Sequence, residues 1–243
     1  MWFVCIFGGR QMERILNPGR KEIAKMMLGY KFALEEIKTK ISILLEEFQL
    51  IHDYCPIEHI ATRLKTPRSI AQKMERKQLA WSMQEIEDKI RDIAGIRIIC
   101  SFEEDIYRIA DILCSQHDIK VIETKDYIKH PKENGYRSLH FIFKIPVYLT
   151  DCVREVFVEV QMRTIAMDFW ASLEHKIFYK YNKTVPTNIR QGLKEVAEQA
   201  AALDDRMATL NKEINLLKEQ EEDSDNENMN NYIQQFIAYN LTH

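Results

Sequence analysis

The sequence predicts an α+β fold, with a mixed β-sheet flanked by helices and further helices at both ends of the chain. Apolar residues recur at helical spacing near both ends, whereas short β-rich segments alternate with helical ones between them. The scarcity of glycine (7) and proline (6) argues against an all-β sandwich rich in tight turns. Helices, then strands mixed with helices, then helices again indicate an α+β core with a helical collar.

The first helix is predicted from a stripe whose members are three or four residues apart: Tyr30, Leu34, Ile37, Ile41, Leu44 and Phe48. Further helices are expected at 69–78, 84–92, 103–116 and 164–180. Short runs rich in β-branched residues predict strands at 95–100, 119–124, 136–145 and 154–161. The elements of both kinds are interleaved, as a mixed sheet with covering helices requires.

A second stripe near the end of the chain predicts a long helix with an apolar seam: Leu193, Val196, Ala200, Leu203, Met207, Leu210, Ile214 and Leu217. Such a seam needs a partner helix, either the N-terminal helix of the same chain or a helix of another subunit. The following residues are acidic and polar. The predicted organisation is a variable extension at 1–25, a core at 26–185, an oligomerisation helix at 186–220 and a disordered acidic tail at 221–243.

Composition excludes several classes of protein. The formal net charge of −3 provides no general attraction to nucleic acid. The five cysteines are odd in number and lack CxxC spacing, which argues against a disulfide framework or a zinc site. The apolar N-terminal run is short and lacks preceding basic residues, and no run reaches the roughly 18 residues of a membrane span. We therefore expect a soluble, cytoplasmic protein without a membrane partner.

The segment 63–77 holds six basic residues and one acidic residue. Extended backbone would place Arg63 and Lys65 on one face, and a following helix would align Ser69, Lys73 and Arg76. Converging positive charge of this kind suits a polyphosphate. A solvated basic surface is the alternative interpretation.

Two carboxylates lie beside predicted strands. Asp92 ends a helix just before the strand at 95–100, and Glu159 lies on the strand face opposite a row of valines. Asp92 could hold Mg²⁺, because this ion takes one or two carboxylates together with phosphate oxygens. Glu159 could bind the same metal or accept a proton from a hydroxyl group. The alternatives are a locally hydrogen-bonded aspartate and a paired structural glutamate.

A loop at 131–135 precedes the strand on which Tyr136, Ser138 and His140 are predicted to share one face. An aromatic ring followed by polar donors suits a nucleobase that is stacked and then hydrogen-bonded. Farther along, Trp170 and Glu174 lie one turn apart on a predicted helix. A core tryptophan with a surface glutamate is the alternative there.

Together these segments resemble the synthetase domain of the RelA/SpoT family, and the short chain with helical ends resembles its single-domain small alarmone synthetases. The matching motifs, in sequence order, are R-x-K…S-x-x-x-K, D-I-A-G-x-R, D-Y-I-x-x-P-K-x-N-G-Y-x-S-L-H, V-E-V-Q-x-R-T and W-A-x-L-E-H. The resemblance implies a nucleotidyltransferase-like mixed sheet. It also implies transfer of pyrophosphate from ATP to the 3′-hydroxyl of GDP or GTP, which makes the alarmones ppGpp and pppGpp.

The resemblance implies residue roles as well. Asp92 and Glu159 would be catalytic and hold Mg²⁺, with Glu159 near the acceptor hydroxyl. ATP would be bound by Arg63, Lys65, Lys73, Arg76 and Arg97. The acceptor would be bound by Lys132, Asn134, Tyr136, His140, Gln161 and Glu174, with Tyr136 stacking on guanine. The resemblance further implies a homo-oligomer, often a tetramer, with an allosteric alarmone site or single-stranded RNA as additional ligands.

Two departures from the family pattern limit these expectations. The element that correlates with GDP or GTP preference in long members reads Glu123-Thr124-Lys125-Asp126 here, a mixture of the known types, so acceptor preference stays open. The isolated His52-Asp53 pair has too little chain before it for a metal-dependent hydrolase, so no alarmone hydrolysis is predicted. The alternative functions are an inactive relative that binds guanine nucleotides or single-stranded RNA, and another nucleotidyltransferase, whose usual Gly-Ser loop and D-x-D pair are not found.

Overall fold

The computed structural model describes residues 18–180 and 186–241, with side chains described at 21–177 and 186–220. It contains one five-stranded sheet in the order β1-β2-β5-β4-β3, in which β2 and β5 are parallel and the other neighbours are antiparallel. The strands are β1 (Ile57–Leu64), β2 (Ala94–Cys100), β3 (Lys120–Asp126), β4 (Leu139–Tyr148) and β5 (Val153–Thr164). The helices are α2 (Pro18–Ile51), α3 (Pro67–Arg76), α4 (Met83–Lys89), α5 (Glu103–Cys114), α6 (Ile165–Lys180) and α7 (Thr187–Leu241). The α+β class and the mixed sheet are therefore confirmed.

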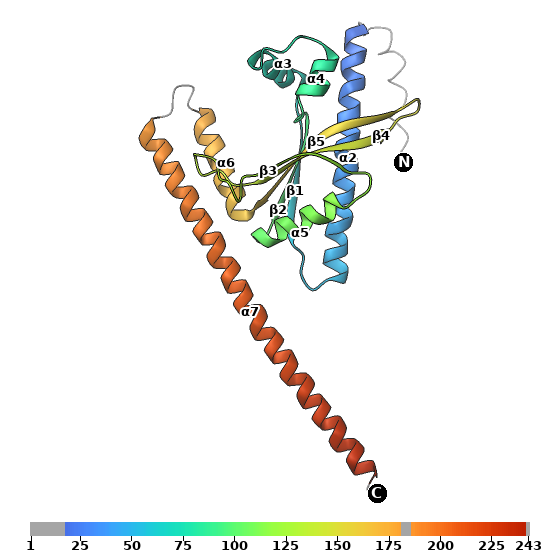
Figure 1. Ribbon diagram of the computed structural model, residues 1–243, viewed down its shortest axis with the longest axis vertical. Helices are drawn as coiled ribbons and strands as arrows, with labels where there is room; N and C mark the ends of the chain where they lie inside the picture. Colours follow the sequence, from blue (N-terminus) through green and yellow to red (C-terminus); the bar gives the residue numbers. More distant parts are fainter. Residues whose placement is uncertain (1–17, 181–185, 242–243) are drawn as a thin grey trace, which may run out of the picture.

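The long helix α2 lies across the sheet and buries the predicted stripe (Figure 1). Tyr30, Ile37 and Ile41 are at most 3% exposed, and they join one core with α5 and the alternate residues of β2, β4 and β5. Burial of a Leu- or Ile-sized side chain contributes about 1.5–3 kcal/mol, which explains why these residues form one continuous face. This helix therefore covers one side of the sheet.

The other side of the sheet carries the polar residues. On β5, Val156, Val158 and Val160 are buried in the core, whereas Glu159 and Gln161 point to the opposite face and remain partly exposed. Residues that pair across neighbouring strands form two rows on this face, each running across the sheet. One row contains Arg63, Gly95, Glu159 and Ile142, and the next contains Ala61, Arg97, Gln161, His140 and Lys125. Residues from five strands thus meet on one surface.

The structure differs from the sequence prediction at two strands. The segment 57–64 forms the edge strand β1, although its alternation is weak because most of its side chains are exposed. The strand β4 begins at Leu139, three residues later than predicted. Lys132 and Tyr136 close a tight turn instead, in which Gly135 N–H donates to Lys132 O at 2.8 Å with a Gly135 φ of 85°. Tyr136 therefore belongs to a loop, and Ser138 turns inward to donate to Met162 O.

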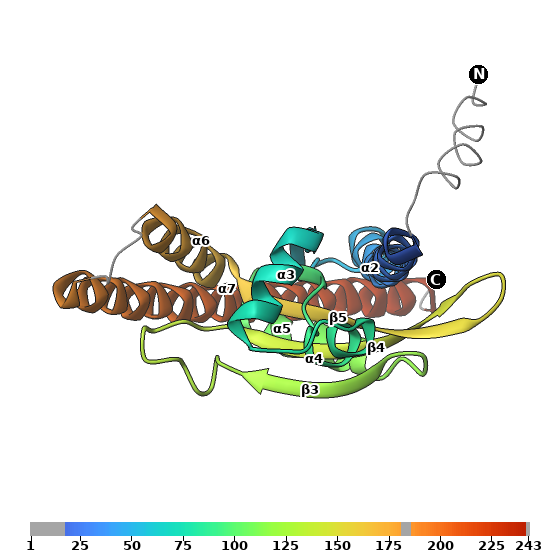
Figure 2. The same cartoon turned by 90° about the horizontal axis from the view of Figure 1, so that it is seen from above.

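The C-terminal helix α7 packs against α6 (Figure 2) and continues well beyond the α/β body (Figure 1). Its backbone is helical to Leu241, where the sequence had suggested a disordered tail from 221. Adding a residue to an existing helix costs much less than nucleating one, so a packed first half can extend through polar sequence. Most of the predicted seam is exposed to solvent, including Leu203 (60%), Met207 (50%) and Ile214 (52%).

Helix α2 already begins at Pro18, inside the predicted extension at 1–25, and residues 1–17 lie outside the described residues. Among the helices that are described, none is both long enough and apolar enough to cross a bilayer.

Candidate active site

A cavity of about 200 Å³ opens on the polar face of the sheet, where β1, β2 and β5 lie side by side. Its lining includes six of the residues selected from the sequence: Arg63, Lys65, Asp92, Arg97, Glu159 and Gln161. These residues are up to 98 positions apart in the chain, from 63 to 161, and the register of the three strands brings them together. We call this cavity the donor pocket.

Two lysines converge on the Asp92 carboxylate at the donor pocket. Its Oδ2 accepts hydrogen bonds from Lys73 Nζ at 2.5 Å and Lys65 Nζ at 2.9 Å. Burial raises the pKa of this carboxyl, but the hydrogen bonds from Lys73 and Lys65 outweigh it, so the net pKa is below its usual value. Asp92 Oδ1 is buried and has no hydrogen-bond partner among the described residues, which leaves one acceptor for a cation.

Glu159 shares the donor pocket with Asp92. Its Oε2 accepts a hydrogen bond from Gln161 Nε2 at 3.1 Å, and its Oε1 lies 4.0 Å from His140 Nδ1. Burial raises the pKa of Glu159, and the negative charge of Asp92 raises it further. A carboxylate with a raised pKa is a stronger base than an ordinary glutamate, so Glu159 is suited to accept a proton.

These two carboxylates could hold a divalent cation together with phosphate oxygens and water. The unpartnered Asp92 Oδ1 and the repulsion between the two carboxylates both favour a positive ion between them. Within the described residues there is no group of three or more His, Cys, Asp or Glu side chains that could hold a metal by itself.

Beside the donor pocket lies an aromatic cluster around Tyr136. Arg163 Nη2 donates to the Tyr136 hydroxyl at 2.7 Å, so that hydroxyl can donate its own proton to His140 Nε2 at 2.8 Å. Burial, together with the charges of Arg163 and Lys132, lowers the pKa of His140 to about 3. The ring is therefore neutral at pH 7, with its proton on Nδ1 facing Glu159.

The loop before β4 completes this cluster, which we call the acceptor site. Lys132 Nζ lies 4.6 Å from the Tyr136 ring centroid and 4.5 Å from that of Tyr127. Asn134 Nδ2 donates to Glu174 Oε1 at 3.1 Å, and Asn134 Oδ1 accepts from Tyr136 N–H at 3.2 Å. Burial lowers the pKa of Lys132, and so does the charge of Lys125. The loop thus presents an aromatic ring, an amide and a cation at one place.

The sequence reasoning missed Arg163 and Asp168, which link the two halves of the site. Arg163 is 5% exposed and contacts Tyr136, Gln161 and Asp168, while Asp168 Oδ1 also accepts from Arg97 Nη1 at 3.0 Å. The available signal was the spacing of 159, 161 and 163 along β5, which places all three on one face. Arg163 therefore orients groups from both the donor pocket and the acceptor site.

Two residues do not lie where the sequence predicts them. Arg76 ends α3 with an exposed side chain and does not line the donor pocket. Ser138, which the sequence placed beside Tyr136, is fully buried instead. The remaining predicted residues lie in or beside the donor pocket or in the acceptor site.

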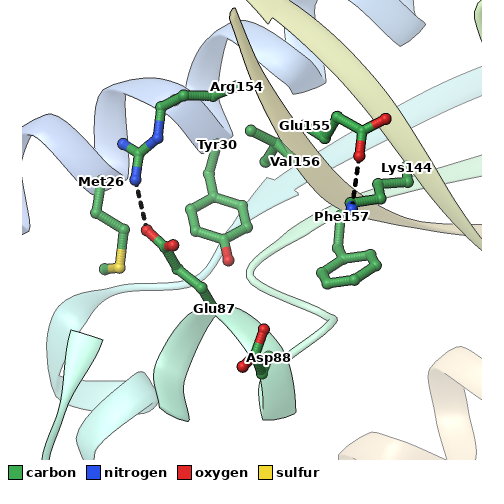
Figure 3. A pocket seen from close by; sticks show the side chains of 10 residues that line it. Met26, Tyr30, Glu87, Asp88, Lys144, Arg154, Glu155, Val156 and Phe157 are labelled. Carbon is green, nitrogen blue, oxygen red and sulfur yellow. Dashed lines mark hydrogen bonds and ion pairs between the residues drawn. The ribbon is translucent and has the colours of Figure 1, made fainter. Parts of the chain in front are cut away.

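A second cavity, of about 240 Å³, lies where α2 and α4 meet β4 and β5 (Figure 3). Its charges are largely paired, since Arg154 contacts Glu87 at 2.6 Å and Lys144 contacts Glu155 at 2.6 Å. None of the site residues selected from the sequence lines it. We therefore place the candidate active site at the donor pocket and acceptor site.

Comparison with known proteins shows the family to which the chain belongs. The family model described as "Region found in RelA / SpoT proteins" matches residues 62–184. GTP pyrophosphokinase YwaC of Bacillus subtilis (strain 168) is 50% identical over 188 residues, which span 77% of this chain and 90% of that protein. GTP pyrophosphokinase YjbM of the same organism is 36% identical over 194 residues, which span 80% of this chain and 90% of that protein.

Solved structures show the same similarity. Small alarmone synthetase 1 of Bacillus subtilis, bound to its product pppGpp, matches with a TM-score of 0.74 and 36% identity, over 79% of this chain and 98% of that chain. Small alarmone synthetase 2 of the same organism matches with a TM-score of 0.72 and 47% identity, over 79% of this chain and 99% of that chain. The family model, these relatives and the shared fold show that the chain belongs to the RelA/SpoT family.

Proposed function

We propose that this protein is a GTP diphosphokinase, which transfers pyrophosphate from ATP to the 3′-hydroxyl of GDP or GTP. The observation that carries the proposal is the position of Glu159 between two prepared sites. On one side is the donor pocket, where Lys65 and Lys73 converge on Asp92, and on the other is the acceptor site around Tyr136. A general base between a polyphosphate site and a nucleobase site suits transfer to a nucleotide hydroxyl.

In the reaction, the acceptor 3′-oxygen attacks the β-phosphorus of ATP, the bond from that phosphorus to the α–β bridging oxygen breaks, and AMP leaves. Glu159 accepts the hydroxyl proton, because its raised pKa makes it the stronger base of the two carboxylates. His140 does not compete for this proton, since Tyr136 occupies its Nε2 and its Nδ1 already carries a proton. Lys65 and Lys73 stabilise the negative charge that develops on the phosphate oxygens.

Binding roles follow from the same geometry. Arg63, Lys65, Lys73 and Arg97 would bind ATP, with Arg76 reaching the nucleotide from the end of α3. Guanine would stack on Tyr136 after displacing Lys132 Nζ from the ring, and Lys132 would then be available for an acceptor phosphate. Asn134, Gln161 and Glu174 would position the acceptor. We propose Mg²⁺ as the cofactor, held by Asp92 and Glu159, where it would neutralise phosphate charge.

The direct test incubates the purified protein with Mg²⁺, γ-labelled ATP and either GDP or GTP, followed by separation of the nucleotides. We expect labelled ppGpp or pppGpp, and the better acceptor resolves the preference that the sequence leaves open. In Glu159→Gln the rate should fall by roughly 10²–10⁴-fold, as for loss of a general base. Glu155→Gln is a matched control, because Glu155 lies on the same face of β5 but is exposed and pairs with Lys144.

If Glu159→Gln forms product at the rate of the parent protein, the assigned mechanism is wrong. An absence of product with both acceptors would favour the alternative of an inactive relative that binds guanine nucleotides or RNA. Release of pyrophosphate from ppGpp in the presence of Mn²⁺ would contradict the prediction that the protein lacks hydrolase activity.

We also propose a homo-oligomer, with a tetramer as the expected state, in which the exposed seam of α7 meets another subunit. The exposed large apolar side chains of that seam support this, since such surfaces mark protein–protein contacts: Val196, Leu203, Met207, Leu210, Ile214 and Leu217. Sedimentation at micromolar concentration should give an oligomer, and a monomer would contradict the proposal. Two further ligands stay hypotheses: an alarmone bound at an allosteric site, and single-stranded RNA bound along the basic segment 63–77. Filter-binding assays with each labelled ligand test them.

A further inference from the structure

The first turns of α7 press directly on the loop that carries the acceptor residues. A Cβ added to Gly135 would lie 2.5 Å from the Ala197 Cβ, well inside van der Waals contact, and 3.7 Å from Lys194 O. Gly135 also has a φ of 85°, which disfavours other residues. The loop and the helix therefore meet backbone to backbone, with only the methyl group of Ala197 between them.

Two more contacts fix α7 at this place. Trp170 Nε1 donates to Leu193 O at 2.8 Å, and the Thr164 hydroxyl donates to Asp204. Residues 193, 197 and 204 are separated by four and seven positions, so they lie on one face of the helix. The exposed part of the seam, at residues 203, 207 and 214, lies on a neighbouring face, and Leu193 is the seam residue that packs against the body. One face of α7 thus belongs to the catalytic body.

The contact between Ala197 and Gly135 is adjacent to Tyr136, the next residue in the chain. Trp170, Ala171 and Ala197 form a small buried cluster against which Tyr136 and Leu193 pack. Gly135 N–H donates to Lys132 O, and Lys132 N–H donates to Tyr136 O, so the turn from 132 to 136 moves as a unit. A group that pushes on Gly135 must therefore also shift Asn134 and Tyr136.

We propose that Ala197 is a positioning residue for the acceptor. Its small side chain fixes the distance between α7 and the turn 132–136, and this distance determines the position of Tyr136 and the affinity for the guanine nucleotide. Ala197 does not itself contact substrate and acts through Gly135 and Tyr136. The inference rests on the proposed function, because it assigns guanine to Tyr136. The donor pocket lies on β1, β2 and β5 and is reached from Tyr136 through Arg163 and Gln161, so ATP binding should be affected less than guanine binding.

The test measures steady-state kinetics with GTP and ATP varied separately in Ala197→Leu. We expect the KM for GTP to rise by about 10-fold or more, since displacements near 1 Å have large kinetic effects, while the KM for ATP changes less than about twofold. Ala202→Leu is the matched control, because it makes the same change at an exposed position of α7 that belongs neither to the seam nor to the contact with Gly135. Ala197→Gly should keep the KM for GTP near that of the parent protein, because it lowers helix stability without crowding Gly135.

Three results would overturn the proposal: an unchanged KM for GTP in a folded Ala197→Leu variant, an equal rise in both KM values, or the same rise in Ala197→Gly. If Ala197→Leu does not fold, Ala197→Ser replaces it with the same expected direction and a smaller rise. If the parent protein makes no product, the proposed function fails, and GDP binding monitored by tryptophan fluorescence still tests Ala197. Equal GDP affinity in the parent and variant would then contradict the positioning role.

Discussion

Lys73 Nζ lies 2.5 Å from Asp92 Oδ2, so the last turns of α3 are tied to the segment that leads into β2. The helix is otherwise attached to the sheet mainly through its buried Ile70 and Met74. The ion pair therefore has two effects: it lowers the pKa of Asp92 and it holds the basic helix over the donor pocket.

Lys73→Met should raise the KM for ATP by about 10-fold, because it removes a charge-assisted hydrogen bond from the donor pocket. The pKa of Asp92 should rise in the variant, since only Lys65 would still hold the charged form. Initial rates at varied ATP concentration measure the change. Lys77→Met is the control, as Lys77 carries the same charge but is exposed and donates to Lys89 O instead of Asp92. Equal effects of the two substitutions would show that general positive charge, not the contact with Asp92, matters.

Without Mg²⁺, the pKa of Glu159 should lie above the ordinary glutamate value of 4.5, because burial and the charge of Asp92 both raise it. Carboxyl ¹³C chemical shifts followed against pH in the metal-free protein measure the titration midpoint. Gln161→Met removes the hydrogen bond that lowers this pKa, so the midpoint should move to higher pH. Gln191→Met on α7 serves as a control. A shift toward lower pH in Gln161→Met would contradict the assignment.

Arg163 should be needed for both stability and acceptor binding. Replacing it removes one of the two arginines that pair with the partly buried Asp168, while Arg97 remains, and should lower the free energy of unfolding by about 1.5–3 kcal/mol. Arg163→Lys should not restore the KM for GTP, because one ammonium cannot reproduce the paired contacts to Tyr136 and Asp168. Urea unfolding and GTP titrations measure the two effects. An Arg163→Lys variant with the parent stability and KM would show that only the charge is required.

Folding stability should fall as the pH drops from 7 to 5, partly through His140. Its pKa is about 3 in the folded protein, against an ordinary histidine value of 6.5, so the unfolded chain binds the extra proton in this range. By linkage, this histidine should account for about 1–2 kcal/mol of the loss. Urea unfolding at both pH values should show a smaller loss in His140→Gln than in His117→Gln, an exposed control. Equal losses would mean that His140 is accessible to protons in the folded protein.

Much of this fold was predictable because its signals are local. The stripe on α2 and the valine alternation on β5 each reflect one buried face, and the structure buries both. The strand β1 gave no such signal, since an edge strand with exposed side chains has little apolar alternation. The start of β4 was misplaced for a similar reason: the turn at 132–136 depends on hydrogen bonds within the loop, which the polar and aromatic sequence does not distinguish from a strand.

The site shows the same division. The sequence indicates Asp92, Glu159 and the basic residues around them, because charge is unusual beside buried strands and because the motifs that hold them follow the order of a known family. The sequence alone determined the α+β class, the family and the residue types available for chemistry. Only the tertiary structure decided that Arg163 joins the two halves of the site, that Ser138 turns inward, and that Ala197 touches Gly135. These pairings depend on strand register and helix packing between residues up to 62 positions apart, from 135 to 197, and such long-range contacts leave no local pattern in the chain.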